Sequence, residues 1–264
     1  MATLLAACAV GIAHATPTDL ITNGDFSQSS HTAPWQFGTN SGGGQFFGGG
    51  SCTYGGNSIT GWQGNGGYEI WYNSSAAAST VEPCTQYSET QLLSPISAPP
   101  AGAGSGSFVG LDGISSPIPN AGISQMINGL VAGAKYTVTF YWGNTQLLNR
   151  SGPTTEYLTV SLGSQSFDTS VNSIGTHGWS GWAPVSFTFT ADSASELLGF
   201  LSIGTPDSLP PFAVLTGISM YQDVPEPSDL ATFGGGLLGL GLLIVFARRR
   251  EMRRRAAEGN NAIS

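Results

Sequence analysis

Apolar and polar side chains alternate along three stretches in the middle of the chain. In residues 136–142, large apolar side chains at even positions alternate with Thr or Tyr at odd positions. Residues 158–162 and 185–189 repeat this pattern, with Ser and Thr at the polar positions. A period of two residues is typical of antiparallel strands that have one buried and one wet face. We therefore expect three half-buried strands, with Trp142 facing the core.

Weaker alternation of apolar and polar residues occurs over most of the chain. Further strands are expected at residues 20–22, 107–111, 122–126, 197–203 and 212–221. Asn23-Gly24, Asp112-Gly113 and Ala132-Gly133 provide turn signals between them. No helical period is visible between the two ends of the chain. The pattern predicts an all-β fold, a jelly roll or β-sandwich, for an exported domain at residues 16–223.

Residues 41–67 interrupt this pattern with twelve glycines in twenty-seven residues. Because glycine loses much backbone entropy on ordering, we expect a long loop here rather than core. The loop is either a flexible insertion or a binding loop whose aromatic side chains face a ligand. Cys52 lies within it, and Cys84 follows. In an oxidising compartment these two cysteines would form a disulfide, with a pair of free thiols as the alternative.

The C-terminal region has the composition of a membrane anchor. Residues 230–247 contain no charged side chain, and a helix of eighteen residues spans about 27 Å, close to the thickness of a bilayer core. Arg248, Arg249 and Arg250 follow directly. By the positive-inside rule we expect one transmembrane helix with a cytoplasmic tail that includes residues 256–264. The alternative is a buried core helix with a solvated basic end.

Pro225, Glu226 and Pro227 stand just before that apolar stretch. Pro-Glu-Pro, an apolar helix and an arginine cluster, in this order, closely resemble the PEP-CTERM sorting signal over residues 224–255. The resemblance implies a partner, a membrane-embedded exosortase of a Gram-negative bacterium that recognises the Pro-Glu-Pro motif and removes the helix. The protein would then be anchored only transiently in the inner membrane before it reaches the cell surface or the exopolysaccharide matrix.

The N-terminal residues suggest export independently. Residues 4–12 are mainly apolar, and Ala13-His14-Ala15 fits signal peptidase cleavage before Thr16. We therefore expect a signal peptide at residues 1–15, although the usual basic segment does not precede the apolar run. Cys8 in Leu5-Ala6-Ala7-Cys8 offers lipidation as an alternative.

Charge is distributed unevenly. The chain has a net charge of −8, with only 9% charged residues, and six of its eight basic residues lie between residues 248 and 255. Residues 1–247 retain Lys135 and Arg150 against fourteen acids. Because so few basic groups could neutralise phosphates, nucleic acid binding by this part is excluded.

Two segments carry a second resemblance. Residues 20–26, Leu-Ile-Thr-Asn-Gly-Asp-Phe, are similar to the opening strand of galactose-binding-like jelly rolls, and residues 125–136 are similar to their middle segment. In such relatives a structural Ca²⁺ is often held partly by acids in the last strand, where this chain has Leu215-Thr216-Gly217-Ile218. The resemblance therefore leaves Asp25 as the single calcium candidate, and no other cofactor is expected.

No catalytic constellation is apparent. The chain lacks a zinc-ligand spacing, a nucleophile elbow and a phosphate-binding loop. Two carboxylates on distant strands could still form a glycosidase site, so Glu69 and Asp112 are kept as acids to test. We expect a protein that is not an enzyme.

Aromatic side chains suggest a ligand class. Tryptophan and tyrosine rings stack on sugars, and a low charge suits neutral glycans. The candidate glycan contacts are Tyr54, Trp62, Tyr68, Trp71 and Tyr72, and for each of them ordinary packing in the domain is the alternative. The leading hypothesis is a structural or adhesive surface protein; the alternatives are a carbohydrate-binding module for exopolysaccharide and, third, a polysaccharide hydrolase.

Overall fold

A computed structural model describes residues 17–30, 35–36, 59–65, 67–80, 93–114, 120–209, 211–223 and 248–252 of the chain. The chain divides into two compact units, residues 1–223 and 224–264. In the second unit, residues 248–252 are helical and exposed. All other elements described below belong to the first unit.

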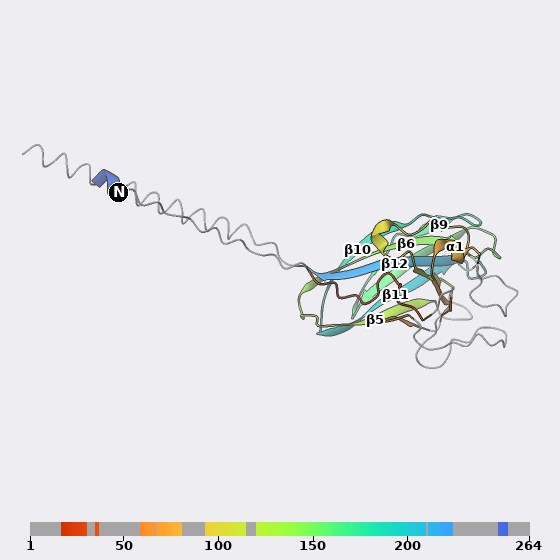
Figure 1. Cartoon of the computed structure of the whole chain (residues 1–264), viewed down its shortest axis with the longest axis horizontal. Coiled ribbons are helices and arrows are strands. Elements are labelled where there is room, and N and C mark those ends of the chain that lie inside the picture. Colours follow the sequence, from red (N-terminus) through yellow and green to blue (C-terminus); the bar gives the residue numbers. More distant parts are fainter. Residues whose placement is uncertain are drawn as a thin grey trace, which may run out of the picture. The chain divides into compact units, whose positions relative to one another are not determined.

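Two antiparallel sheets make up the first unit. The β12 sheet has the strand order β1 (Trp35–Gln36), β3 (Glu69–Tyr72), β4 (Phe108–Asp112), β12 (Pro211–Gln222), β6 (Lys135–Gln146) and β10 (Ala183–Thr190). The β11 sheet has the order β2 (Gln63–Gly64), β5 (Gly122–Asn128), β11 (Ser195–Thr205), β7 (Thr154–Leu162) and β8 (Gln165–Asp168), and β9 (Asn172–Ile174) also pairs with β7. In Figure 1, β6, β10 and β12 of the β12 sheet lie in one layer, and β5 and β11 of the β11 sheet lie in the other. This confirms the predicted all-β sandwich.

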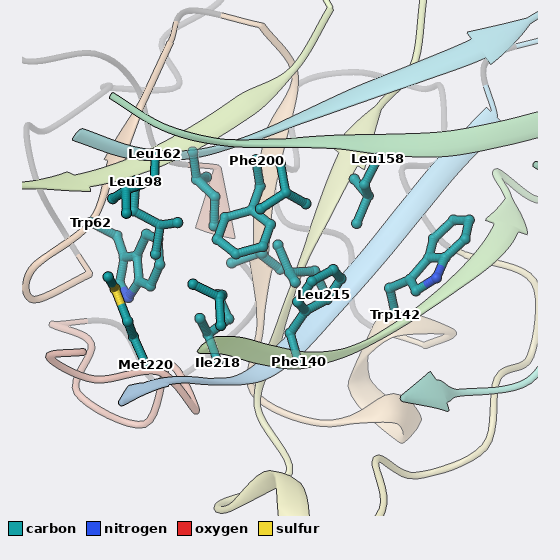
Figure 2. Close-up of a cluster of buried hydrophobic side chains, with 14 of the residues drawn as sticks. Trp62, Phe140, Trp142, Leu158, Leu162, Leu198, Phe200, Leu215, Ile218 and Met220 are labelled. Atoms are coloured by element: carbon teal, nitrogen blue, oxygen red, sulfur yellow. The ribbon is translucent and has the colours of Figure 1, made fainter. Parts of the chain in front are cut away.

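The alternating patterns of the sequence place one face of each sheet in a shared core. Phe140, Leu215 and Ile218 of the β12 sheet point toward Leu158 and Phe200 of the β11 sheet (Figure 2). These side chains are almost completely removed from solvent. Trp142 belongs to this core, as predicted, because it is in phase with Phe140 on β6.

A second, smaller apolar cluster covers part of the other face of the β12 sheet. It contains Phe108, Phe212 and Val214 from the sheet, together with Ala78 of the short helix α1 (Ser75–Ala78) and Leu93. The 3₁₀ helix η1 (Ala101–Ala103) contacts β12 further along. Only one part of this face is therefore buried, and the open part contains the candidate site.

Residues 20–22 differ from their prediction, because they form no strand. Leu20 donates its N–H to the Met220 carbonyl at 2.9 Å, as a strand residue would. The N–H groups of Ile21 and Thr22, however, bind the side chains of Asp19 and Gln125. Side-chain acceptors thus replace the ladder that a regular strand requires.

Several predictions lie outside the described residues. These are the signal peptide, the Cys52–Cys84 disulfide, the Pro225-Glu226-Pro227 motif and the transmembrane helix at residues 230–247. Among the described residues, no helix has the length and apolar character needed to cross a bilayer.

Candidate functional site

The aromatic side chains predicted to contact glycan are mostly in the interior. Trp62 and Tyr72 are completely buried and Trp71 is 3% exposed. For these three residues the alternative of ordinary packing is confirmed, the hypothesis of a surface contact is wrong, and none of the three rings can offer a face to a ligand. Tyr68 is half-buried and packs edge-on against Phe212, while Tyr54 lies outside the described residues.

Two backbone carbonyls near the N-terminus explain why the tryptophans are buried. Trp62 Nε1 donates to the Asn23 carbonyl at 3.0 Å, and Trp71 Nε1 donates to the Phe26 carbonyl at 2.8 Å. A buried indole needs such an acceptor for its N–H. The end of the glycine-rich segment therefore differs from the predicted loop. Gln63–Gly64 pairs with β5 in the β11 sheet, and the preceding Trp62 lies in the core.

Asp25, the calcium candidate, uses both carboxylate oxygens to hold nearby backbone. Oδ1 accepts from the Ser27 N–H and hydroxyl, at 3.2 and 2.8 Å, and Oδ2 accepts from the Ser105 N–H at 3.0 Å. Partial burial favours the neutral form, but these hydrogen bonds leave the pKa of Asp25 below its ordinary value. Among the described residues, no three His, Cys, Asp or Glu side chains form a group that could hold a metal. Calcium binding stays a prediction.

The two acids kept as hydrolase candidates are also removed from solvent. Glu69 is completely buried, and its Oε1 accepts from the N–H groups of Asn65 and Gly67 at 3.1 and 3.0 Å. Burial raises the pKa of Glu69 to about 7, against the opposing effect of these donors. Asp112 is 3% exposed, and its Oδ1 accepts from the Ile114 N–H at 3.0 Å. Both carboxyl groups are buried and accept hydrogen bonds from backbone N–H groups.

A third buried acid, Glu156, had no signal in the sequence. Its Oε1 accepts from the Ser202 hydroxyl at 2.6 Å. A Cβ on Gly113 or Gly204 would approach its Oε2 to 2.4 or 2.3 Å, so two glycines make the space for this carboxyl group. Burial and the neighbouring Asp112 raise the pKa of Glu156 well above its ordinary value. Glu156 is also completely buried.

The open part of the β12 sheet contains a shallow cavity of about 380 Å³, which we call the outer groove. Tyr141 and Thr139 of β6 lie opposite Pro184 and Ser186 of β10 in the ladder. On the other side of β6, the register of β12 shifts between Thr216 and Ser219. The groove is lined by Gly102, Thr139, Phe140, Tyr141, Pro184, Val185, Ser186, Gly217 and Ser219.

Two glycines let the wall of the groove approach Tyr141. Gly217 has a φ of 63°, a backbone conformation that residues other than glycine rarely adopt. A Cβ at Gly217 would lie 2.9 Å from Ala103 Cα and 3.1 Å from Tyr141 Cδ2. A Cβ at Gly102 would lie 3.3 Å from the Tyr141 hydroxyl. The irregular segment of β12 and the η1 helix can therefore flank the tyrosine closely.

The chemistry of the outer groove is uncharged and rich in hydroxyl groups. Its lining contains no acid or base, and Thr139, Tyr141, Ser186 and Ser219 each provide a hydroxyl that can donate and accept. Tyr141 is only half-buried, so part of its side chain is accessible to solvent. The arrangement suits a neutral ligand with many hydroxyl groups of its own.

Two tryptophans lie close to this region in sequence. Trp182 precedes Pro184 by two residues, and such residues point to the same side of a strand. Trp179 and Trp182 are half-buried and pack against each other with ring centroids 5.3 Å apart. Their Nε1 groups donate to the hydroxyl and the carbonyl of Ser97. This pair belongs to the rim of the second cluster.

No protein-family model and no curated protein matches the sequence. Solved structures give distant likenesses. TmCBM61, solved with β-1,4-galactotriose, is 11% identical, with 78% of this chain and 99% of that chain covered and a TM-score of 0.37. The C-terminal family 22 carbohydrate-binding module of Clostridium thermocellum Xyn10B is 12% identical, with coverages of 62% and 87% and a TM-score of 0.34. A CBM4 structure is 13% identical, with coverages of 77% and 99% and a TM-score of 0.31.

Proposed function

We propose that residues 16–223 form a non-catalytic carbohydrate-binding domain that holds neutral glycan chains in the outer groove. The observation that carries this proposal is the uncharged, hydroxyl-lined cavity around Tyr141. Its volume, about 380 Å³, is within the range of small-molecule sites, and it can accommodate a few sugar rings of a longer chain.

Tyr141 is the central residue of the proposed site. A tyrosine ring offers apolar surface to the C–H groups of a sugar, while its hydroxyl and those of Thr139 and Ser219 can bond the ring substituents. The lining has no cation to pair with uronate or sulfate groups. Neutral polysaccharides are therefore favoured over acidic ones.

Binding of soluble polysaccharides to the purified domain tests this proposal. Neutral β-galactan, xylan and β-glucan are compared with a polyuronate by calorimetry and affinity electrophoresis. Tyr141→Ala is expected to weaken the binding of the best neutral chain about tenfold, because the stacking surface and one hydroxyl are lost.

Tyr157→Ala is the matched control. Tyr157 is also a half-buried tyrosine on a long strand, but it lies on the outward face of the β11 sheet. It should leave the affinity unchanged. Equal losses in the two variants, or tightest binding to the polyuronate, would overturn the assignment of the site.

We further propose that this domain acts outside the cell after export and exosortase sorting, in a structural or adhesive role. Support comes from the sequence at both ends, the apolar segment before Thr16 and the order of Pro225-Glu226-Pro227, apolar stretch and Arg248–Arg250. Mass spectrometry of the mature protein from its native host tests this. A C-terminus that retains the arginines would exclude removal of the anchor.

A further inference from the structure

β10 forms one edge of the β12 sheet and is the longest edge strand among the described residues. β10 pairs with β6 over eight consecutive residues without a bulge. The other described edge strands, β1, β2, β8 and β9, have two to four residues. Natural proteins usually protect such an edge with charges, bulges or proline. Ala183–Thr190 contains no charge and only Pro184 near its start.

The hydrogen bonds at the end of β10 show which residues face outward from the sheet. The Ala191 N–H donates to the Ala134 carbonyl at 3.0 Å, on the side of β6. The Thr190 N–H instead donates to Gln165 Oε1, and its carbonyl accepts from Gln165 Nε2. Because these directions alternate along a strand, Ser186 and Thr188 point their N–H and C=O groups away from β6, like Thr190.

Only the middle of this edge is therefore open. At one end the Gln165 amide occupies both backbone groups of Thr190. At the other end, Pro184 has no N–H to offer. Ser186 and Thr188 are exposed, and no partner for their outward backbone groups occurs in the described part of the chain.

The open backbone groups of β10 can pair with the same groups of β10 in a second copy of the chain. In an antiparallel pair centred on Phe187, Ser186 lies opposite Thr188 of the second copy, and the two residue pairs exchange four hydrogen bonds. The next pair outward sets Pro184, which lacks an N–H, against Thr190, whose groups already bind Gln165. In this register the Thr190 groups keep their Gln165 partner, and the Pro184 carbonyl is the one outward backbone group of the two residues that is left without a donor.

We propose that a second copy of this chain pairs with the β10 edge, antiparallel and centred on Phe187, and extends the β12 sheet across a two-fold axis. The contact is isologous and closes after two copies. Phe167, 40% exposed, stacks on Phe187 with ring centroids 5.5 Å apart, so apolar surface lies beside the hydrogen-bonded edge.

The two-fold axis is perpendicular to the sheet, because Ser186 and Thr188 point to the same face in both copies. The two outer grooves would consequently lie on one continuous surface. This last consequence rests on the proposed function, whereas the pairing itself does not. Two grooves on one surface would bind a single polysaccharide chain with a gain from multivalency.

Sedimentation velocity of the purified residues 16–223, without glycan, tests the pairing. Between about 1 µM and about 500 µM the average mass should rise toward twice that of one copy. Thr188→Lys should weaken association roughly fivefold, because two like charges meet across the axis. Ser173→Lys, at an exposed position of β9 in the other sheet, is the charge-matched control and should associate like the unchanged protein.

Gln165→Ala provides a test with the opposite sign. Removal of this amide releases the N–H and C=O of Thr190, and the Thr190 N–H can then reach the Pro184 carbonyl of the second copy. Association should become stronger. A protein that remains a single copy throughout the range overturns the proposal, as do equal effects of the two lysine variants or a mass that grows beyond two copies. Glycan binding by a single copy would leave the proposed function intact.

Discussion

The outward face of the β12 sheet has two parts that differ in what covers them. Over β3 and β4, Tyr72 and Phe108 are completely buried within the second cluster. Over β6 and β10, Thr139 and Ser186 reach solvent in the outer groove. The strand β12 contributes to both parts, Phe212 to the covered one and Ser219 to the open one. One face of a sheet can therefore form a second core at one end and an open, hydroxyl-lined cavity at the other, because the composition of its strands changes along their length.

The largest effect is expected from breaking the covered part. Phe108 is fully buried and stacks on Tyr72 with ring centroids 5.1 Å apart. Phe108→Ala removes most of this side chain from a packed site, which should lower the free energy of unfolding by about 3 to 5 kcal/mol. Urea unfolding measures the change. A loss below about 1 kcal/mol would mean that this part is not a core.

The pH dependence of stability tests the covered part, because this part contains a buried titratable group. Asp112 lies on the covered part, opposite Phe212 in the ladder. Burial raises the pKa of Asp112 to about 7, although the Ile114 N–H and the Arg150 charge act against it. The ordinary pKa of an unfolded aspartate is about 3.9, so the folded state binds the proton more tightly.

The resulting stabilisation is complete below about pH 4 and is lost as the pH rises through about 7. An asparagine side chain does not titrate. Asp112→Asn should therefore reduce the slope of the unfolding free energy against pH by up to about 1.4 kcal/mol per pH unit in this window. Glu69 and Glu156 leave a residual slope of the same sign, because burial raises their pKa values also. An unchanged slope in Asp112→Asn would contradict this account. Glycan affinity, in contrast, should be flat over the same pH range.

A smaller effect is expected at the boundary of the two parts. Gly217→Ala would place a side chain at a φ of 63° and bring its Cβ within 3.1 Å of Tyr141 and Ala103. We expect a loss of about 1 to 2 kcal/mol in unfolding free energy, together with weaker glycan binding as the wall of the groove shifts. Gly129→Ala is the control, because its φ is also positive, at 81°, but a Cβ there meets nothing within 4 Å. It should cost stability without a change in affinity.

The smallest effect on stability should come from the open part. Thr139 is half-buried on the groove side of β6. Thr139→Ala should change the unfolding free energy by no more than about 0.5 kcal/mol, while glycan affinity falls measurably. Parallel urea unfolding and calorimetry separate the two readouts. A large loss of stability would show that the open part also contributes packing.

Much of the fold could be predicted from the sequence because strand alternation is a local property. The phase of residues 136–142 placed Trp142 in the core, and the same phase placed Thr139 and Tyr141 on the wet face. A tyrosine at a polar position of a strand is therefore the sequence signal for the proposed site. Aromatic content near the glycine-rich segment does not distinguish a ligand contact from a core residue, as the burial of Trp62 and Trp71 shows.

Strand alternation alone does not decide between the interior and the surface for Trp62 and Trp71, because their burial depends on contacts that are distant in sequence. Their indole groups need the carbonyls of Asn23 and Phe26, which lie 39 and 45 residues away. The outer groove likewise combines η1, β6, β10 and β12, and its depth depends on the bulge near Gly217. Alternation gives the face of each residue, but not which strands become neighbours.

The position of β12 also determines how the domain responds to mechanical force. β12 is the last strand of the first unit and lies between β4 and β6, paired on both sides. A pull on the chain beyond Asp223 acts along this strand, and antiparallel hydrogen bonds are perpendicular to the strand direction. The load is therefore shared by both ladders in shear, instead of opening them one bond at a time, as it would at an edge strand. A domain that is pulled through a central strand therefore resists peeling better than one that is pulled through an edge strand.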